Sequence, residues 1–453
     1  MKKMLSIAAV AALATSSFAA SDLAGAFKEG KTSGQIRAMY IKNDLSSTAN
    51  DAGTPDNSAF GLGGKLAYET APLYGISVGA AFYTVQDLGT KSQTMLKNDP
   101  FMFSESNTGN PQSYSLLGQA YVQGQFGKTT VKVGRQQIDT PLAGSDDVRV
   151  IPNLFEAALV INTDLPSTTL IGGYVARMAG LDSGSDKAPR TAFQSMSRAA
   201  LNSAVEGLGT ASAVKDNGVY VAAIVNNSIK DLTLQAWEYY AVDVVNAVYL
   251  QADYKLGLGK DMALNLAGQY YNVNGIGKTK DLLKANTLGK INYDVYGVKA
   301  GLENSTGLTP YVAFNKVSEQ KDNSGGTFVF GAWGGYPEFA VADETWYNSF
   351  GQSVTGAATK ALNGAQVWKA GADYSLEKIG LGARTIGASY VKYDLKNQYN
   401  GNVDADTNVW DVKYTCTGAL VKNLDAVLLY EQADSKNDNL DNKKVKVTFN
   451  YNF

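Results

Sequence analysis

Apolar and polar residues alternate one by one along many short segments of this chain of 453 residues. In the last ten residues, one set is Val445, Val447, Phe449, Tyr451 and Phe453, and the alternate set is Lys444, Lys446, Thr448, Asn450 and Asn452. Successive side chains of a strand point to opposite faces, so the pattern predicts a strand with one apolar and one wet face. An edge strand of a soluble sheet also fits, but a membrane barrel gives the terminal Phe453 a place at the lipid interface.

Segments of this kind recur along the whole chain and predict about 18 strands, an even number as in bacterial single-chain barrels. They lie near 33–43, 58–69, 75–85, 115–126, 129–136, 154–163, 168–178, 218–226, 231–240, 245–255, 261–272, 291–303, 308–318, 365–375, 382–393, 407–418, 424–431 and 443–453. The connectors alternate between short and long, except that 240–245 is short where a long loop is due. A soluble β-sandwich would scatter its loop lengths instead.

Beyond the N-terminus no run of about 18 apolar residues appears, which excludes spanning helices but not a closed barrel. Tyr is abundant and Pro is scarce, at 26 and 10 residues. Tyr in quantity is typical of interfacial aromatic girdles. We therefore predict an all-β fold: a transmembrane antiparallel β-barrel with short periplasmic turns and long extracellular loops.

The first 19 residues have the pattern of a secretory signal peptide. Lys2 and Lys3 form a positive region, an apolar stretch follows, and Ser17 to Ala19 offers a small-x-small cleavage site. A short membrane anchor is the alternative, but the apolar stretch is too short to span. The predicted organisation is a signal peptide over 1–19 and an outer-membrane barrel over 20–453, with a loop of about 136–153 folded inward.

The chain has no His and a single Cys, Cys416. The lack of His removes Ser-His-Asp and Cys-His catalysis and most zinc sites, so we expect no enzyme, no cofactor and no metal. Cys416 shares its parity with Trp410, Val412 and Tyr414, which predicts buried packing instead of a nucleophile. The slightly acidic balance gives no basic field for nucleic acid.

Three groups of charged residues are candidates for function. The segment from Gly134 to Glu156 is either a solvated surface loop or a loop folded into the lumen, where its charges select ions. Charges on wet faces either solvate the lumen or set selectivity; they are Arg37, Lys65, Arg177, Lys299, Lys369, Lys413, Lys444, Lys446, Glu69, Asp253, Asp373 and Asp411. Acidic clusters at 404–406 and 434–441 are either solvated loop tips or sites that bind calcium or bridge lipopolysaccharide, although neither has a calcium-loop spacing.

The block around Val133 resembles the OprD-type substrate-specific porins and the related major outer membrane porins of epsilonproteobacteria. The residues that carry the likeness are Val131 to Gln136, Thr140, Pro141, Asp147 to Arg149, Pro152, Phe155, Glu156, Leu165 to Leu170, Gly173 and Tyr174. The resemblance implies an 18-stranded barrel and passive diffusion past a constriction that the third loop forms against a basic wall. It also implies that the barrel-insertion machinery reads the C-terminal aromatics Phe449, Tyr451 and Phe453.

Carried over residue by residue, the constriction-loop candidates are Arg135, Asp139, Asp146, Asp147 and Arg149. The pore-wall candidates are Arg37, Arg177, Lys369, Asp411 and Lys413, which do not reproduce the basic ladder of that family. The expected function is a porin for small hydrophilic solutes and ions. The alternative is a structural or adhesive surface barrel with a closed lumen. Expected partners are outer-membrane lipid, lipopolysaccharide and the barrel-assembly machinery, with a monomer or a homotrimer as the assembly.

Overall fold

The computed structural model describes most of the chain. The described ranges are 20–45, 57–89, 102–105, 111–183, 190–205, 217–285, 291–319, 333–345, 364–395, 406–418, 421–436 and 441–453. The predicted signal peptide over 1–19 lies outside them, as do parts of the acidic clusters at 404–406 and 434–441.

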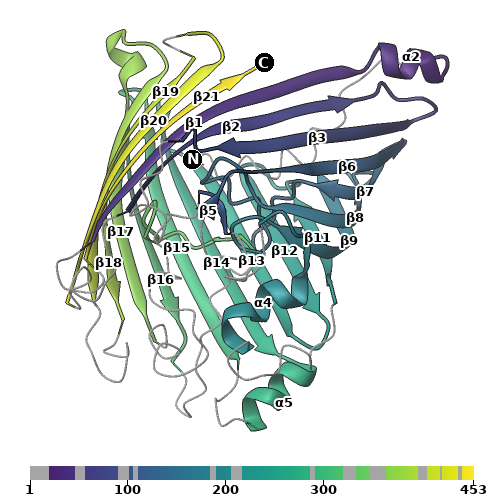
Figure 1. The fold of residues 1–453 in the computed structure, drawn as a ribbon. Coiled ribbons are helices and arrows are strands. Elements are labelled where there is room, and N and C mark those ends of the chain that lie inside the picture. Colours follow the sequence, from purple (N-terminus) through teal and green to yellow (C-terminus); the bar gives the residue numbers. More distant parts are fainter. Residues whose placement is uncertain are drawn as a thin grey trace.

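One antiparallel sheet runs through the described residues and closes on itself, because the first strand pairs with the last (Figure 1). Of its 19 strands, β10 has only two residues, which leaves a wall of 18 and confirms the predicted fold class. The wall strands are β1 (Lys31–Leu45), β2 (Asn57–Glu69), β3 (Ile76–Gln86), β6 (Tyr114–Phe126), β7 (Thr129–Gln136), β8 (Leu154–Asn162), β9 (Thr168–Ala179), β11 (Val219–Asn226), β12 (Leu232–Ala241), β13 (Val245–Gly257), β14 (Met262–Gly275), β15 (Asn292–Asn304), β16 (Leu308–Val317), β17 (Gln366–Ser375), β18 (Arg384–Asp394), β19 (Thr407–Thr417), β20 (Leu424–Ser435) and β21 (Asn442–Asn452). The remaining elements are α2 (Leu23–Lys28), β4 (Ser104–Glu105), β5 (Pro111–Gln112), β10 (Gln194–Ser195), α4 (Met196–Val205), α5 (Gly277–Ala285) and the short η5 (Leu376–Ile379).

The sequence alternation predicted all of these wall strands, with ends that differ by a few residues. Short turns and long connectors alternate around the barrel, and the short link between β12 and β13 is present as expected. Not predicted were the helices α4 and α5, which the ribbon places at the end opposite α2 and the C-terminus (Figure 1). No described helix is long and apolar enough to cross a membrane.

The two faces of the wall differ in chemistry. Large apolar side chains are exposed on the outward face of nearly every strand, among them Val133, Tyr220, Trp368 and Trp410. Their neighbours in sequence point inward and are buried, as the alternating burial of β3 and β11 shows. An apolar outward band with aromatic girdles is what a barrel in a lipid bilayer requires.

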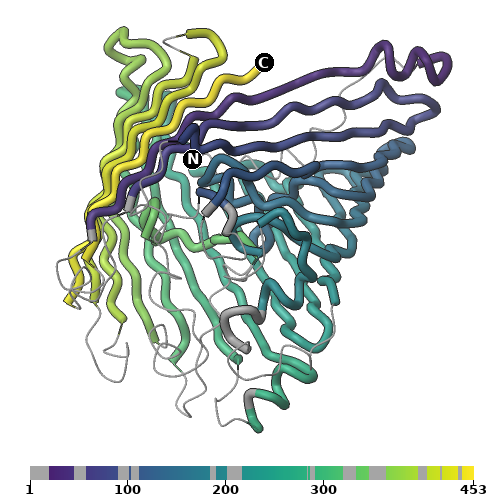
Figure 2. Tube along the Cα trace, viewed as in Figure 1, coloured from purple at the N-terminus to yellow at the C-terminus, as the bar shows by residue number. Residues whose placement is uncertain are grey.

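The barrel is far from empty, because connectors cross its interior (Figure 2). The largest buried cluster joins wall residues such as Tyr239 to connector residues such as Leu142, Trp333 and Ala340. Cys416 has no exposed surface, in agreement with its predicted role in packing.

Candidate functional site: two loops held against the inner wall

The connector between β7 and β8, residues 137–153, leaves the wall and packs against inward-facing side chains. Ile138 and Leu142 are buried in the main cluster, and the Leu142 N–H donates to the Tyr239 hydroxyl of β12 at 3.3 Å. On the other side of the barrel the same loop contacts Arg37 of β1. We refer to residues 137–153 as the first inner loop.

Arg37 fixes the first inner loop to β1. Its guanidinium donates to both oxygens of Asp147, at 2.6 and 2.9 Å, and also to the Arg149 carbonyl oxygen. The remaining Nε–H donates to Asn450 of β21 at 2.6 Å. Arg37 is 4% exposed, whereas the Asp147 side chain is 43% exposed. The guanidinium is therefore buried at the wall, and the carboxylate is partly in contact with water.

A second segment, residues 333–345 of the connector between β16 and β17, runs alongside the first. We call it the second inner loop. Gly144 donates its N–H to the Trp333 carbonyl oxygen at 2.9 Å, and Ala143 forms a β-bridge with Gly334. Glycine is required at this crossing: Gly334 has φ of +74°, and a Cβ on Gly144 would lie 2.8 Å from the Gly334 oxygen.

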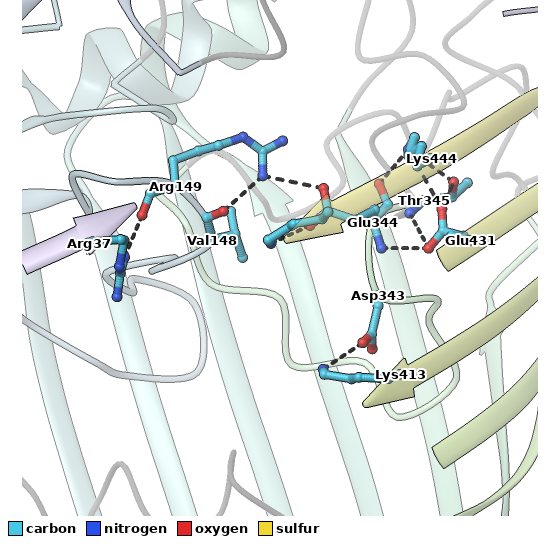
Figure 3. Close-up of polar contacts among 10 residues, drawn as sticks. Arg37, Val148, Arg149, Asp343, Glu344, Thr345, Lys413, Glu431 and Lys444 are labelled. Atoms are coloured by element: carbon cyan, nitrogen blue, oxygen red, sulfur yellow. Dashed lines mark hydrogen bonds and ion pairs between the residues drawn. The ribbon is translucent and has the colours of Figure 1, made fainter. Parts of the chain in front are cut away.

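Glu344 of the second inner loop lies between two cationic side chains. Its carboxylate is 2.6 Å from Lys446 of β21. It is 3.3 Å from Arg149 of the first inner loop, a contact that Figure 3 shows. Burial opposes its ionisation, but the charges of Lys446, Arg149 and Lys444 outweigh burial and lower the pKa of Glu344 to about 2. Glu344 is therefore a buried anion that joins both loops to the wall.

Wall residues on β19 to β21 complete the attachment of the second inner loop. Glu431 of β20 accepts hydrogen bonds from the backbone N–H of Glu344 at 2.7 Å and from the Thr345 hydroxyl at 2.5 Å. Lys444 lies 3.6 Å from the same carboxylate. Asp411 of β19 is opposite Glu431 in the register and accepts from the Ser389 hydroxyl at 2.9 Å.

Two further lysines of the inner wall hold the second inner loop. Lys413 pairs with Asp343 at 2.6 Å, and Lys369 donates to the Val341 carbonyl oxygen at 2.7 Å (Figure 3 shows the first pair). Burial works against the charged form of Asp343, but Lys413 and Lys369 prevail and lower its pKa. The predicted pore-wall residues Arg37, Lys369, Asp411 and Lys413 thus line one stretch of the inner wall, each beside a loop or another acid.

The other acidic candidates of the first inner loop have partners in connectors, not on the wall strands. Asp139 accepts from the Ser145 backbone N–H at 3.0 Å and from its hydroxyl at 2.5 Å, which closes a turn. Asp146 lies beside Asp182, whose pKa is raised by burial despite hydrogen bonds from Asn153 and Tyr336 and contact with Asp146. Asp147 of the same loop faces a wall cation directly, Arg37 of β1.

Arg135 and Arg177 do not join this site. In the register of β7, β8 and β9 they flank Glu156, which lies on the outward face with Val160. Arg177 was predicted on the wet face because it shares the parity of Val175. The pairing is shifted between Glu156 and Ala157, so β9 carries an extra residue there and Arg177 is turned outward.

Sequence reasoning missed the second inner loop and its acids, Asp343 and Glu344. It also passed over Glu431, although the alternation of β20 indicates an inward side chain. Residues 333–345 show no periodic pattern of apolar residues. The feature that could have indicated an inner loop is the presence of Trp333, Pro337 and three acidic residues in the longest connector.

Among the described residues, no group of three or more His, Cys, Asp or Glu side chains is arranged to hold a metal ion. A closed barrel with an apolar outside and charged loops held inside defines an outer-membrane channel protein. The chain belongs to the OprD family of outer membrane porins, whose family model matches residues 24–453.

Solved structures with the same fold cover nearly the whole chain. OccK8 (OprE) of Pseudomonas aeruginosa has 17% identity and a TM-score of 0.71 over 94% of this chain and 99% of its own. OpdK of the same organism, solved with vanillate, has 15% identity and a TM-score of 0.68 over 94% and 99%. OccAB1 of Acinetobacter baumannii has 13% identity and a TM-score of 0.70 over 97% and 98%. No curated protein matches the chain.

Proposed function

We propose that the two inner loops together form the constriction of a diffusion channel for small hydrophilic solutes and ions. The observation that carries this is the set of ion pairs between the loops and the inner wall, Asp147 with Arg37, Glu344 with Lys446 and Asp343 with Lys413. Ion pairs at a narrow point act in a reduced dielectric and set which solutes pass. Transport needs no covalent step, and the proposal includes no enzymatic activity.

The charged groups that attach the inner loops to the wall nearly balance. They are six cations, Arg37, Arg149, Lys369, Lys413, Lys444 and Lys446, and five acids, Asp147, Asp343, Glu344, Asp411 and Glu431. Three further acids of the loops, Asp139, Asp146 and Glu338, have other contacts. Most of the attaching groups are buried against their partners, whereas the side chains of Asp147 and Lys413 are 43% and 46% exposed. Mild ion selectivity follows, governed by these two exposed charges.

Asp147→Asn is expected to shift the reversal potential in a salt gradient toward anion preference, because Arg37 then loses its neutralising partner at the water-filled face. Asp139→Asn removes an equal charge from the same loop, but at a carboxylate bonded to Ser145, and serves as the matched control. Asp146→Asn should have a smaller effect than Asp147→Asn. Equal reversal potentials for wild type and Asp147→Asn would show that Asp147 does not face the ion path.

Passive diffusion is tested by liposome swelling with uncharged sugars of increasing size. The proposal expects swelling rates that fall steadily with solute size and do not saturate with concentration. The alternative of a closed structural or adhesive barrel is favoured by one observation, the buried packing of Leu142, Trp333 and Ala340 in the interior. Liposomes that contain folded protein and fail to swell would support that alternative.

The remaining parts of the proposal concern export and assembly. Residues 1–19 act as the signal peptide, and 20–453 form the barrel in the outer membrane. The outward-facing Phe449, Tyr451 and Phe453 serve as the signal for the barrel-assembly machinery, which their exposure on the last strand supports. In this proposal the protein is a monomer or a homotrimer surrounded by lipid and lipopolysaccharide. The resemblance of the block from Val131 to Glu156 supports a kinship with the epsilonproteobacterial porins, which stays a proposal.

A further inference from the structure

Three charged side chains form a row on the outward face of the wall. In the register, Glu156 of β8 lies opposite Arg135 of β7 on one side and Arg177 of β9 on the other. The Glu156 carboxylate is 3.0 Å from Nε of Arg135 and 3.9 Å from Nε of Arg177. We call these three residues the outer charge row.

The neighbouring rows show where the outer charge row lies relative to a bilayer. The next outward row toward the periplasm contains Val133, Ala158 and Tyr174, and Val133 is exposed. The Tyr174 ring lies 4.9 Å from that of Tyr220, which is exposed on β11, as part of an aromatic girdle. Aromatic girdles mark the interface, so charges one row beyond them lie at the level of the outer headgroups.

The outer charge row has the composition of an anion site. Two guanidiniums flank one carboxylate, which leaves one net positive charge. Arg135 is held in place by a hydrogen bond to the Leu117 carbonyl oxygen at 3.2 Å and by the Phe193 ring, 4.3 Å from its guanidinium. The Arg177 side chain is 58% exposed and is 3.9 Å from its acid, so most of its donors face outward.

We propose that the outer charge row binds a phosphate group of lipid A, the phosphorylated glucosamine lipid of the outer leaflet. A planar guanidinium fork matches phosphate oxygens, and the carboxylate keeps the two forks apart and oriented. The inference rests on the outer-membrane location that the family defines and is independent of whether the lumen conducts.

The test is native mass spectrometry of the detergent-purified protein with bisphosphorylated lipid A. Arg135→Gln combined with Arg177→Gln is expected to weaken binding roughly tenfold or more, because two charge-assisted hydrogen-bond partners are lost. Arg177→Lys keeps the charge without the fork and should give an intermediate loss. Lys316→Gln removes an exposed outward-facing cation from β16 and should bind as wild type does.

Dephosphorylated lipid A and phosphatidylglycerol separate the possible sources of binding. Wild type should bind dephosphorylated lipid A as weakly as the double variant binds bisphosphorylated lipid A. The double variant should bind the phosphorylated and the dephosphorylated lipid equally. Unchanged binding by the double variant, or equal affinity of wild type for dephosphorylated lipid A or phosphatidylglycerol, would overturn the assignment. Heat-modifiable migration in gels confirms that each variant is folded, and silent but folded channels would leave this result unaffected.

Discussion

Replacing Arg37 by methionine is expected to release the first inner loop from β1 and to raise the single-channel conductance. Methionine keeps an unbranched apolar stem but removes every donor that binds Asp147, the Arg149 carbonyl oxygen and Asn450. Because Asp147 remains partly in water, the loss corresponds to about 2–3 kcal/mol of charged hydrogen bonds and not to a full burial penalty.

The measurement is conductance in a planar bilayer, with Lys65→Met as the matched control. Lys65 lies on β2, two strand positions from Arg37's partner Gly63, and among the described residues it forms no hydrogen bond to either inner loop. We expect larger and noisier conductance steps for Arg37→Met and wild-type steps for Lys65→Met. If both variants conduct like wild type, the contact between Asp147 and Arg37 does not hold the loop across the ion path.

Replacing Glu344 by glutamine is expected to have the larger effect on stability. The change leaves the buried Lys446 without its anion and removes one partner of Arg149, and an unpaired buried charge costs roughly 3–5 kcal/mol. The temperature at which the barrel loses its folded migration in gels should fall, and the second inner loop should become accessible to protease. Glu319→Gln changes an exposed residue of the same connector and should leave both readouts unchanged.

The lowered pKa of Glu344 also predicts how the loops respond to acid. The folded pKa of about 2 lies below the ordinary glutamate value of 4.5, so the stabilisation is fully present above about pH 4.5. It is lost as the pH falls through the folded value. Wild-type conductance should therefore stay constant from pH 7 down to about 4.5, and changes confined to that window would contradict the assignment of Glu344 as the joint between the loops.

The wall of the barrel was predictable because each strand must satisfy water on one face and lipid on the other. As a result, segments such as 443–453 and 407–418 alternate between apolar and polar residues. The observed strands match the predicted segments, with small differences at their ends. The inner loops carry no such period. Arg37 and Asp147 are 110 residues apart in sequence, and only the closed barrel brings them together.

The two arginines of the outer charge row lie away from the inner loops for different reasons. Arg135 shares the parity of Val131 and Val133, so the alternation of β7 predicts that it points outward. The likeness to a family motif instead favoured a position in the constriction loop. The outward direction of Arg177 could not be predicted from alternation, because an extra residue in β9 reverses the inward and outward positions after Val175. A single shift of register moves a side chain from the lumen to the lipid face.

The central claim is that two inner loops, joined by ion pairs to a basic wall, narrow a lumen that still conducts. Recording the refolded mature protein in a planar bilayer under a salt gradient tests it most directly. We expect discrete conductance steps and a small reversal potential, since the charged groups that attach the inner loops to the wall nearly balance. A correctly folded barrel that gives no steps would contradict it and would identify the inner loops as a plug.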